Sequence, residues 1–360
     1  MIVLDSHCDT PSQIMRLRNL GLDNERGHVD FPKLKAGGVD ASFFALFTPQ
    51  TMAPDAATRY TLEMIAGVHD QVEANPDKVA MAYSHEDILK NKARGLVSIL
   101  LGIENGLPVQ KSLSLLREFH RMGVRYMTLT HNGDNEIADS VAGNGAWNGL
   151  SPFGREVVAE MNRLGMIIDM AHASDKTFFD TLECSSKPIV STHSCCRALA
   201  SHRRNMTDEM IKAMADKGGV IQINFYPVFL SDDYVRVLAE SGLEPAVDKA
   251  DKEFRLDPGN PEKIRNWNQA QDWLRALPRP GVEVVVDHIE HAVAVGGIEH
   301  VGIGTDYDGI DIPPFGLENV SMLGRVFDEM KRRSFSDDAI EKVAGANFLR
   351  VLDEVSNGVK

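Results

Sequence analysis

Short apolar segments rich in β-branched residues alternate along the chain with longer segments of helical periodicity. Most of the short segments are continuously apolar, which is typical of parallel strands covered on both faces. Eight of them predict strands, at residues 2–5, 39–47, 96–103, 126–130, 166–170, 188–192, 219–225 and 300–305. Amphipathic segments with suitable N-caps lie between them, for example 112–122, 151–164 and 207–217. This alternation predicts an α/β protein with a closed (β/α)8 TIM barrel.

Two stretches depart from the alternation. Residues 231–281 hold Trp267, Trp273 and a DPGNP turn signal, so we expect a helical insertion after the seventh strand that flanks the mouth of the barrel. Residues 336–355 have apolar positions at helical spacing and predict a C-terminal helix packed on the outside of the barrel. We expect residues 1–360 to form a single barrel domain that contains the insertion.

Charge and composition exclude several function classes. The 360 residues carry a net charge of -14 without a Lys/Arg cluster, which argues against binding to nucleic acid. The start MIVLDSHCDTP does not read as a signal peptide, and no apolar run approaches the roughly 18 residues of a membrane span. A cytoplasmic protein without membrane attachment is therefore expected. The four cysteines have no CxxC pairing and are predicted to be reduced thiols.

Ionisable side chains end most of the predicted strands. They are His7 and Asp9, Glu104, His131, His172, His193 and Asp306. In such barrels functional side chains lie at the carboxyl ends of the strands. His7 and Asp9, two residues apart, can face one ion together, and a carboxylate such as that of Glu104 can bridge two ions. One strand-end histidine alone is more often structural, but this convergence predicts a metal site.

Eight motifs extend the interpretation beyond single residues. DSHCDTP, GIENG, YMTLTHN, LSPFGREVVAEMNRLGMIIDMAHAS, STHS, SHRRN, INFYP and GIGTDYDG follow one another over nearly the whole chain. In this order they resemble the motifs of the renal (membrane) dipeptidase family, zinc dipeptidases of the amidohydrolase-like superfamily. The resemblance implies two Zn²⁺ ions per chain. One would be held by His7 and Asp9, the other by His172 and His193, with Glu104 bridging both.

The resemblance also implies catalytic and substrate-binding roles. Asp306 matches the catalytic carboxylate, which would act as general base and then general acid, with Asp308 as a supporting residue. His131 matches the histidine that polarises the substrate, and we expect its protonated form to stabilise the oxyanion. Arg204 matches the arginine that binds the C-terminal carboxylate of a dipeptide. The alternatives are a surface ion pair for Arg204 and a structural imidazole for His131, while Asp169 could support His172 or make a structural hydrogen bond.

The predicted activity is hydrolysis of dipeptides, including L-Xaa-D-Xaa, by a hydroxide that bridges two zinc ions. Side-chain preference stays open, because Val228, Phe229 and Leu230 follow INFYP where relatives contribute to the pocket. An alternative is an amidohydrolase of another small amide, lactam or ring, although such enzymes commonly carry His-x-His and often a bridging lysine. Metal binding without activity would require the loss of Asp306 or the bridging residue, and both are present. Family members are frequently dimers, so a homodimer is compatible with the resemblance.

Overall fold

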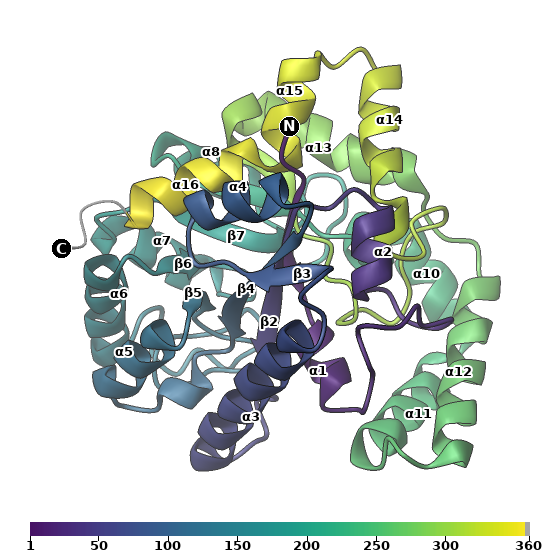
Figure 1. The fold of residues 1–360 in the computed structure, drawn as a ribbon. Coiled ribbons are helices and arrows are strands. Elements are labelled where there is room, and N and C mark those ends of the chain that lie inside the picture. Colours follow the sequence, from purple (N-terminus) through teal and green to yellow (C-terminus); the bar gives the residue numbers. More distant parts are fainter. Residues whose placement is uncertain (357–360) are drawn as a thin grey trace.

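The computed structural model describes residues 1–356 and has a nine-stranded parallel sheet, eight strands of which wind into a barrel. Figure 1 shows how the helices surround it. The strands are β1 (Leu4–Cys8), β2 (Ala41–Phe47), β3 (Val79–Met81), β4 (Val97–Glu104), β5 (Val124–Thr128), β6 (Ile167–Asp169), β7 (Ile189–Ser194), β8 (Val220–Ile223) and β9 (Val301–Ile303). Their order is β1-β2-β4-β5-β6-β7-β8-β9. The Asp9 N–H donates to the Tyr307 carbonyl at 2.8 Å, and the Asp306 N–H donates to the His7 carbonyl at 3.0 Å. These bonds nearly close the barrel, and the predicted fold class is confirmed.

Strand β3 was not predicted. It pairs with β4 at Val97–Ile99, while β5 pairs with β4 only from Leu101 onward. Because β2 pairs with β4 over both stretches, β3 and β5 share the other edge of β4. A strand of three residues is too short to give a periodic signal in the sequence. It extends the sheet beside the barrel without entering the closed order.

The helices fill the predicted amphipathic segments and several of the loops. The first eight are α1 (Thr10–Ile14), α2 (Phe31–Ala36), α3 (Pro54–Glu73), α4 (His85–Ala93), α5 (Leu113–Arg121), α6 (Pro152–Leu164), α7 (Asp175–Cys184) and α8 (Asp208–Asp216). The others are α9 (Pro227–Leu230), α10 (Asp232–Ser241), α11 (Glu244–Leu256), α12 (Pro261–Ala276), α13 (Val282–Gly296), α14 (Gly324–Arg332), α15 (Asp337–Glu341) and α16 (Asn347–Ser356). Ser112, Ser151 and Thr207 cap α5, α6 and α8 with their side chains, as the sequence predicts.

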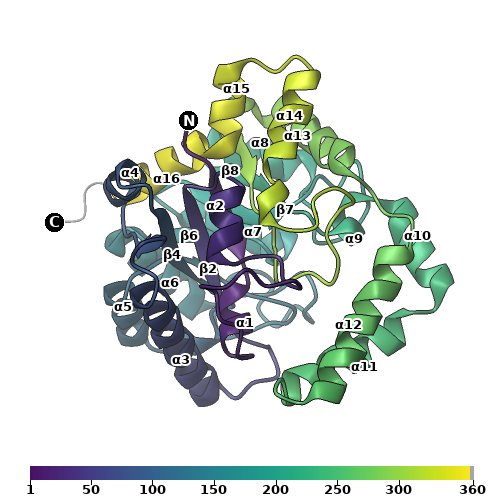
Figure 2. The same ribbon diagram turned by 45° about the vertical axis from the view of Figure 1, so that its right-hand side comes forward.

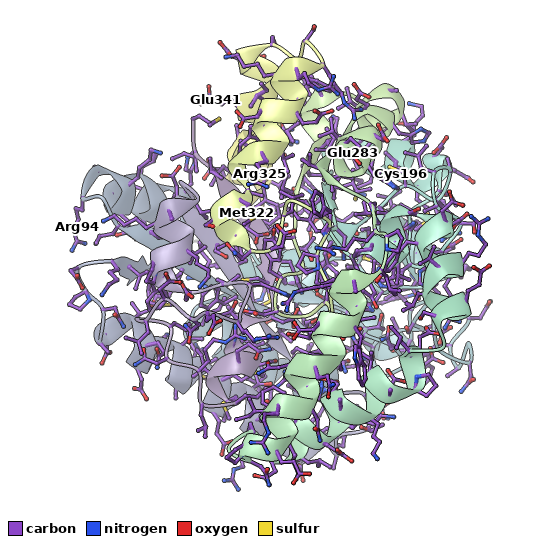
Figure 3. All side chains as sticks on the ribbon, turned by 90° about the vertical axis from the view of Figure 1, so that its right-hand side faces the viewer. Arg94, Cys196, Glu283, Met322, Arg325 and Glu341 are labelled. Atoms are coloured by element: carbon purple, nitrogen blue, oxygen red, sulfur yellow. The ribbon has the colours of Figure 1, made fainter. Side chains whose placement is uncertain are left out.

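Residues 231–281 fold mainly into α10, α11 and α12. The last two lie side by side, apart from the strands, and a side view shows them in front of the barrel (Figures 2 and 3). A small apolar cluster holds them together, with Leu238, Val247 and Leu274 among its members. The guanidinium of Arg26 donates two hydrogen bonds to Asp272, at 3.0 and 2.9 Å. The insertion therefore has its own small core and is tied to the N-terminal loop by a charged pair.

The C-terminal helix α16 lies at a different place from the one expected. It contacts β6, β8 and β9 and packs against the inward side chains at the amino ends of the strands. The Phe348 ring meets the Phe43 ring at a centroid distance of 5.4 Å, and Phe43 in turn packs on Tyr126 at 5.2 Å. Amphipathic spacing predicts a buried face but not the surface that buries it. The helix plugs the amino end of the barrel instead of packing on its outer wall.

Two expectations from composition can be compared with residues 1–356. None of the helices there combines the length and the apolar character that crossing a bilayer requires. The cysteines Cys8, Cys184, Cys195 and Cys196 are free thiols, and all but Cys184 are buried. The three buried thiols pack as small apolar side chains, as predicted, whereas Cys184 does not.

Candidate metal centre

The predicted metal ligands meet at the carboxyl end of the barrel. His7 and His193 lie within β1 and β7, Glu104 is the last residue of β4, and His172 follows β6 by three residues. Together with Asp9 they are buried, each with 7% or less of its surface exposed. Side chains of such polarity are buried only when they are paired or bind a ligand. The barrel thus brings residues from four strands into one compact cluster.

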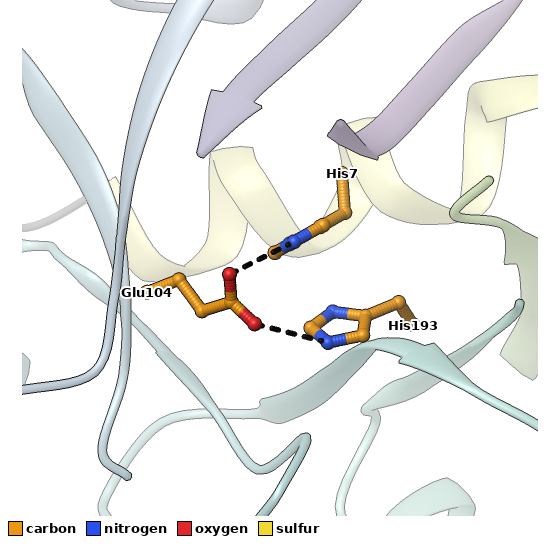
Figure 4. A group of neighbouring side chains, drawn as sticks. All are labelled: His7, Glu104 and His193. Atoms are coloured by element: carbon orange, nitrogen blue, oxygen red, sulfur yellow. Dashed lines mark ion pairs between the residues drawn. The ribbon is translucent and has the colours of Figure 1, made fainter. Parts of the chain in front are cut away.

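The carboxylate of Glu104 lies between two sets of potential ligands, and Figure 4 shows it between one member of each, His7 and His193. Its Oε2 is 3.6 Å from His7 Nε2, which is 3.5 Å from Asp9 Oδ2. Its Oε1 is 3.1 Å from His172 Nε2 and 3.5 Å from His193 Nε2. Each carboxylate oxygen therefore faces a different set, which is the arrangement needed to bridge two cations.

The spacing of the nitrogen atoms fits a divalent ion. His172 Nε2 and His193 Nε2 are 3.1 Å apart. Two nitrogens bound tetrahedrally to zinc at about 2.0–2.1 Å would be separated by roughly 3.3 Å. His7 Nε2 is buried and has no hydrogen-bond partner among the described residues. Imidazole and carboxylate groups with unmet lone pairs at this spacing fit Zn²⁺ or a related ion.

The second ring nitrogen of each of these histidines has its own partner. The pairs are His7 Nδ1 with the Tyr126 hydroxyl at 2.9 Å, His193 Nδ1 with Thr192 Oγ1 at 2.9 Å, and His172 Nδ1 with Asn132 Oδ1 at 3.1 Å. An Nδ1–H that donates to these oxygens leaves the lone pair on Nε2 free for a metal. The three partners were not identified from the sequence, although Asn132 and Thr192 are adjacent to predicted site residues.

Asp169 supports the neighbouring part of the cluster. It accepts hydrogen bonds from the Thr192 hydroxyl at 2.7 Å and the Thr192 N–H at 2.8 Å, and also from the Thr128 hydroxyl. These contacts lie next to His193 rather than His172, so of the two predicted roles Asp169 has the structural hydrogen bonds. Asp169 fixes the hydroxyl that orients His193.

Burial and mutual charge set the protonation of the cluster. Burial lowers the pKa values of His172 and His193 well below the usual range, so both imidazoles are neutral, as metal ligands must be. Burial opposes ionisation of Glu104, but the charge of His7 and hydrogen bonds from histidines hold its pKa well below normal. Burial and the negative charge of Glu104 raise the pKa of Asp9. Burial disfavours the charged form of His7, yet the negative charges of Glu104 and Asp9 raise its pKa well above normal. The two carboxylates therefore favour a positive charge at this place.

Asp306 stands beside His7 and Asp9, within the range of a shared ion. The Asn224 side-chain amide donates to its Oδ2 at 2.8 Å, and burial raises its pKa. The backbone of Asp306 is left-handed, with φ of 61°, as is that of His172, with φ of 66°. Non-glycine residues adopt this conformation rarely and often at functional sites. The loops after β6 and β9 thus hold two site residues in strained backbone.

Asp308, two residues further on, is engaged elsewhere. Arg18 donates to its Oδ1 at 2.7 Å, the Thr10 hydroxyl donates to its Oδ2 at 3.0 Å, and the His28 N–H donates to its Oδ1 at 3.1 Å. Burial opposes its ionisation, but the positive charge of Arg18 lowers its pKa. Asp308 ties the loop after β9 to the N-terminal loop.

His131 lies at the edge of the cluster. Its Nε2 is 3.8 Å from Glu104 Oε1, and its ring packs on His172 at a centroid distance of 4.2 Å and on the edge of Phe47 at 4.6 Å. Burial lowers its pKa to about 4, against the opposing effect of Glu104. This direction favours a neutral imidazole over the protonated form that we expected. A neutral imidazole retains one N–H to donate.

Arg204 is a buried cation without a carboxylate partner in residues 1–356. Its Nη2 donates to the His193 carbonyl at 3.2 Å, its guanidinium lies 5.3 Å from the centre of the Phe229 ring, and its Nε has no hydrogen-bond partner. Only 7% of the residue is exposed, so a surface ion pair is excluded. Burial lowers its pKa. A guanidinium left unpaired beside a metal cluster fits the binding of an anionic substrate group.

A cavity of about 330 Å³ opens over the cluster. Asp9, Glu104, His131, His172 and Asp306 line it. Phe229 is part of its wall, whereas Arg204 lies against Phe229 and is not. The insertion contributes Asp248, Asp251 and Arg255.

Glycine at one position of this wall leaves room for two carboxylates. A Cβ at Gly309 would lie 2.1 Å from Asp9 Oδ2 and 2.6 Å from Asp306 Oδ1, so a side chain here would displace both carboxylates. The close approach of the backbone here keeps both carboxylates facing the cavity.

Comparison with known proteins decides the family. The sequence pattern of the membrane dipeptidase family, peptidase family M19, matches residues 1–359. The chain belongs to this family. The family resemblance found in the motifs is thus confirmed, and the chain is a member of a family of metal-dependent dipeptide hydrolases.

Relatives of this M19 chain include two fungal proteins. It is 32% identical over 371 residues to an uncharacterized dipeptidase of Schizosaccharomyces pombe, covering 97% of this chain and 79% of that one. It is also 32% identical over 340 residues to the dipeptidase TcpJ of Claviceps purpurea, covering 92% and 70%.

Solved structures share the fold. The probable dipeptidase PvdM from Pseudomonas aeruginosa matches with a TM-score of 0.84 at 28% identity, over 99% of this chain and 96% of that one. A metallopeptidase from Rhodobacter sphaeroides, solved with a phosphinate mimic of L-Ala-D-Ala, has a TM-score of 0.80 at 22% identity, over 99% of both chains.

Proposed function

We propose that this M19 protein is a binuclear zinc dipeptidase. One Zn²⁺ would be held by His7 and Asp9 and the other by His172 and His193, with Glu104 shared between them. The observation that carries the proposal is the placement of the two Glu104 oxygens, each of which faces its own set of ligands. Neutral imidazoles at tetrahedral spacing favour zinc over the harder cations Mg²⁺ and Ca²⁺.

The residues around the ions have separable roles in peptide hydrolysis. When bound, two such ions supply a water nucleophile of lowered pKa and polarise the scissile carbonyl. Asp306 accepts a proton from the attacking water and returns it to the leaving amine, and its raised pKa suits both steps. Neutral His131 donates its N–H toward the oxygen on which negative charge develops. These positions are compatible with a general base and an oxyanion donor on either side of one carbonyl.

Arg204 would select substrates with a free C-terminus. Its unpaired Nε is buried next to Phe229, which lines the cavity, and a carboxylate that reached it past this ring would supply the missing acceptor. The cavity of about 330 Å³ over the cluster is large enough for a dipeptide. We propose L-Xaa-D-Xaa dipeptides among the substrates, and the ligand of the Rhodobacter sphaeroides protein makes L-Ala-D-Ala the first one to test.

The deciding experiment uses protein loaded with zinc and the same protein stripped by a chelator. L-Ala-D-Ala and L-Ala-L-Ala are offered to both, with L-Ala-D-alaninamide as the control that lacks the carboxylate. We expect two zincs per chain by metal analysis, metal-dependent release of alanine from the dipeptides and little from the amide. Equal hydrolysis after chelation, or no hydrolysis of either dipeptide with two zincs bound, would refute the proposal.

A further inference from the structure

A second cavity of about 220 Å³ adjoins the one over the metal cluster. It lies between the insertion and the N-terminal loop, where Gln13, Phe254 and Trp267 are among its lining residues. The two cavities share part of their walls, namely Arg16, Asp251, Arg255 and residues 308–311. A substrate side chain directed away from the cluster on this side would enter it.

Five arginines line this second cavity, in a chain whose net charge is -14. Four of them have carboxylate partners. The pairs are Arg18 with Asp308 at 2.7 Å, Arg26 with Asp272 at 2.9 Å, Arg275 with Asp272 at 3.0 Å, and Arg255 with Asp251 at 2.5 Å. Arg16 is the exception.

Arg16 is a partly buried cation whose charge is not matched. Within residues 1–356 its side chain makes no ion pair and no hydrogen bond, and its guanidinium lies 5.5 Å from the centre of the Phe254 ring. Burial and the positive charge of Arg255 lower its pKa to about 10. Burying a charge without a partner is unfavourable, so an anion at this point would offset a cost that the free protein carries.

Two of the acidic residues in the same wall are paired with arginine, although Oδ1 of Asp251 has no hydrogen-bond partner among the described residues. Asp308 and Asp251 have the arginine partners named above. Burial and repulsion from Asp251 raise the pKa of Asp311 to about 6, and the Tyr226 hydroxyl donates to it at 3.3 Å. Among the five arginines that line the pocket, Arg16 is therefore the one without a carboxylate partner in the described part of the chain.

We propose that the Arg16 pocket binds a carboxylate on a substrate side chain, so that the preferred dipeptides contain aspartate or glutamate. The inference rests on the proposed dipeptidase function and names its substrate class. A volume of about 220 Å³ is below that of pockets for whole ligands, roughly 300–1,000 Å³, and suits a single side chain. The planar fork of arginine matches a carboxylate in two-point contact.

The test compares glutamate with glutamine, which have nearly the same size and differ in charge. With the zinc-loaded enzyme, kcat/KM is measured for Ala-Glu against Ala-Gln and for Glu-Ala against Gln-Ala, with L and D forms of the second residue. We expect a preference of about tenfold or more for glutamate in at least one order, the scale of one charge-assisted contact. Arg16→Gln should bring that ratio close to one. Arg59→Gln, a substitution on the exposed face of α3, should keep it.

The wild-type ratios are decisive even if Arg16→Gln fails to fold. Equal kcat/KM for glutamate and glutamine in both orders would overturn the inference, as would a glutamate preference that survives in folded Arg16→Gln. A preference for Lys-Ala or Ala-Lys over the glutamine peptides would also overturn it, because Asp248 and Asp251 would then receive the side chain. Failure to hydrolyse any dipeptide, Ala-Ala included, would instead refute the proposed function.

Discussion

The two ends of the barrel are built from the same strands and have opposite chemistry. At the amino end the inward side chains are apolar and pack against α16; on four adjacent strands they are Leu100, Tyr126, Ile167 and Val190. Two or four residues later the same strands carry buried polar side chains, namely Glu104, Thr128, Asp169 and Thr192. Residues two apart on a strand share a face. The inward face of each strand therefore contributes to the apolar core at its amino end and to the site at its carboxyl end. Stability and chemistry are thus separated along each strand, and substitutions at the two ends should have separable effects.

The largest effect is expected from Glu104→Gln at the carboxyl end. A neutral amide cannot bridge two cations, so turnover should fall to background and the zinc content below two per chain. Dipeptide hydrolysis and metal analysis measure both, and the metal-free protein should still unfold cooperatively. Glu63→Gln on the surface of α3 is the matched control. A Glu104→Gln protein with two zincs and full activity would remove Glu104 from the bridging position.

Asp306→Asn should be nearly as damaging to catalysis while leaving the metals in place. Loss of a general base and acid lowers kcat by about 10²–10⁴-fold. The zinc content should stay at two per chain, which distinguishes this variant from Glu104→Gln. Wild-type kcat in Asp306→Asn would show that the proton is handled by another group.

At the amino end, Phe348→Ala should affect stability and spare the chemistry. Removing a fully buried ring lowers the free energy of unfolding by about 3–5 kcal/mol. Denaturant unfolding measures this, and kcat below the transition should stay within about twofold of wild type. Phe315→Ala is the control because that ring is 67% exposed, and its effect should be about 0.5 kcal/mol or less. A large loss of kcat in folded Phe348→Ala would mean that the two ends are coupled.

Tyr126→Phe tests a contact that joins the two ends. The Tyr126 ring belongs to the apolar layer, while its hydroxyl orients His7. Losing the hydroxyl should weaken zinc binding about tenfold and the free energy of unfolding by about 1 kcal/mol. Competition with a chelator measures the affinity, with Tyr83→Phe on the surface as control. The Thr192 hydroxyl also lies 3.3 Å from His7 Nδ1, so an unchanged zinc affinity would show that Thr192 alone can orient His7.

Much of this architecture could be predicted because functional side chains in a (β/α)8 barrel lie at the carboxyl ends of the strands. Once the strands are recognised in the sequence, the residues at their ends are the candidates for the site. The eight barrel strands follow from their continuous apolar runs, and the residues at the ends of those runs identify the cluster. His7, Glu104, His172 and His193 each end or follow a run, so their convergence needs no knowledge of distant contacts.

Contacts made between segments far apart in the sequence could not be predicted. The pairing of Tyr126 with His7 and the neutral state of His131 depend on burial that only the folded barrel creates. Strand β3 is too short to give a periodic signal, and the face of α16 gives no clue to the surface that it covers. The Arg16 pocket exists only where the insertion docks, more than 230 residues further along the chain.

The plug at the amino end has a consequence for how the chain is made. Phe43 in β2 packs on Phe348 in α16, and β1 is joined by backbone hydrogen bonds to the loop after β9. During synthesis the first strands therefore lack these contacts until about three hundred further residues have emerged from the ribosome. Until then their apolar edges and inner faces lack native cover, which favours aggregation or chaperone capture. We therefore expect low temperature or added chaperones during expression to raise the yield of folded protein. Substitutions at the metal cluster should alter that yield less.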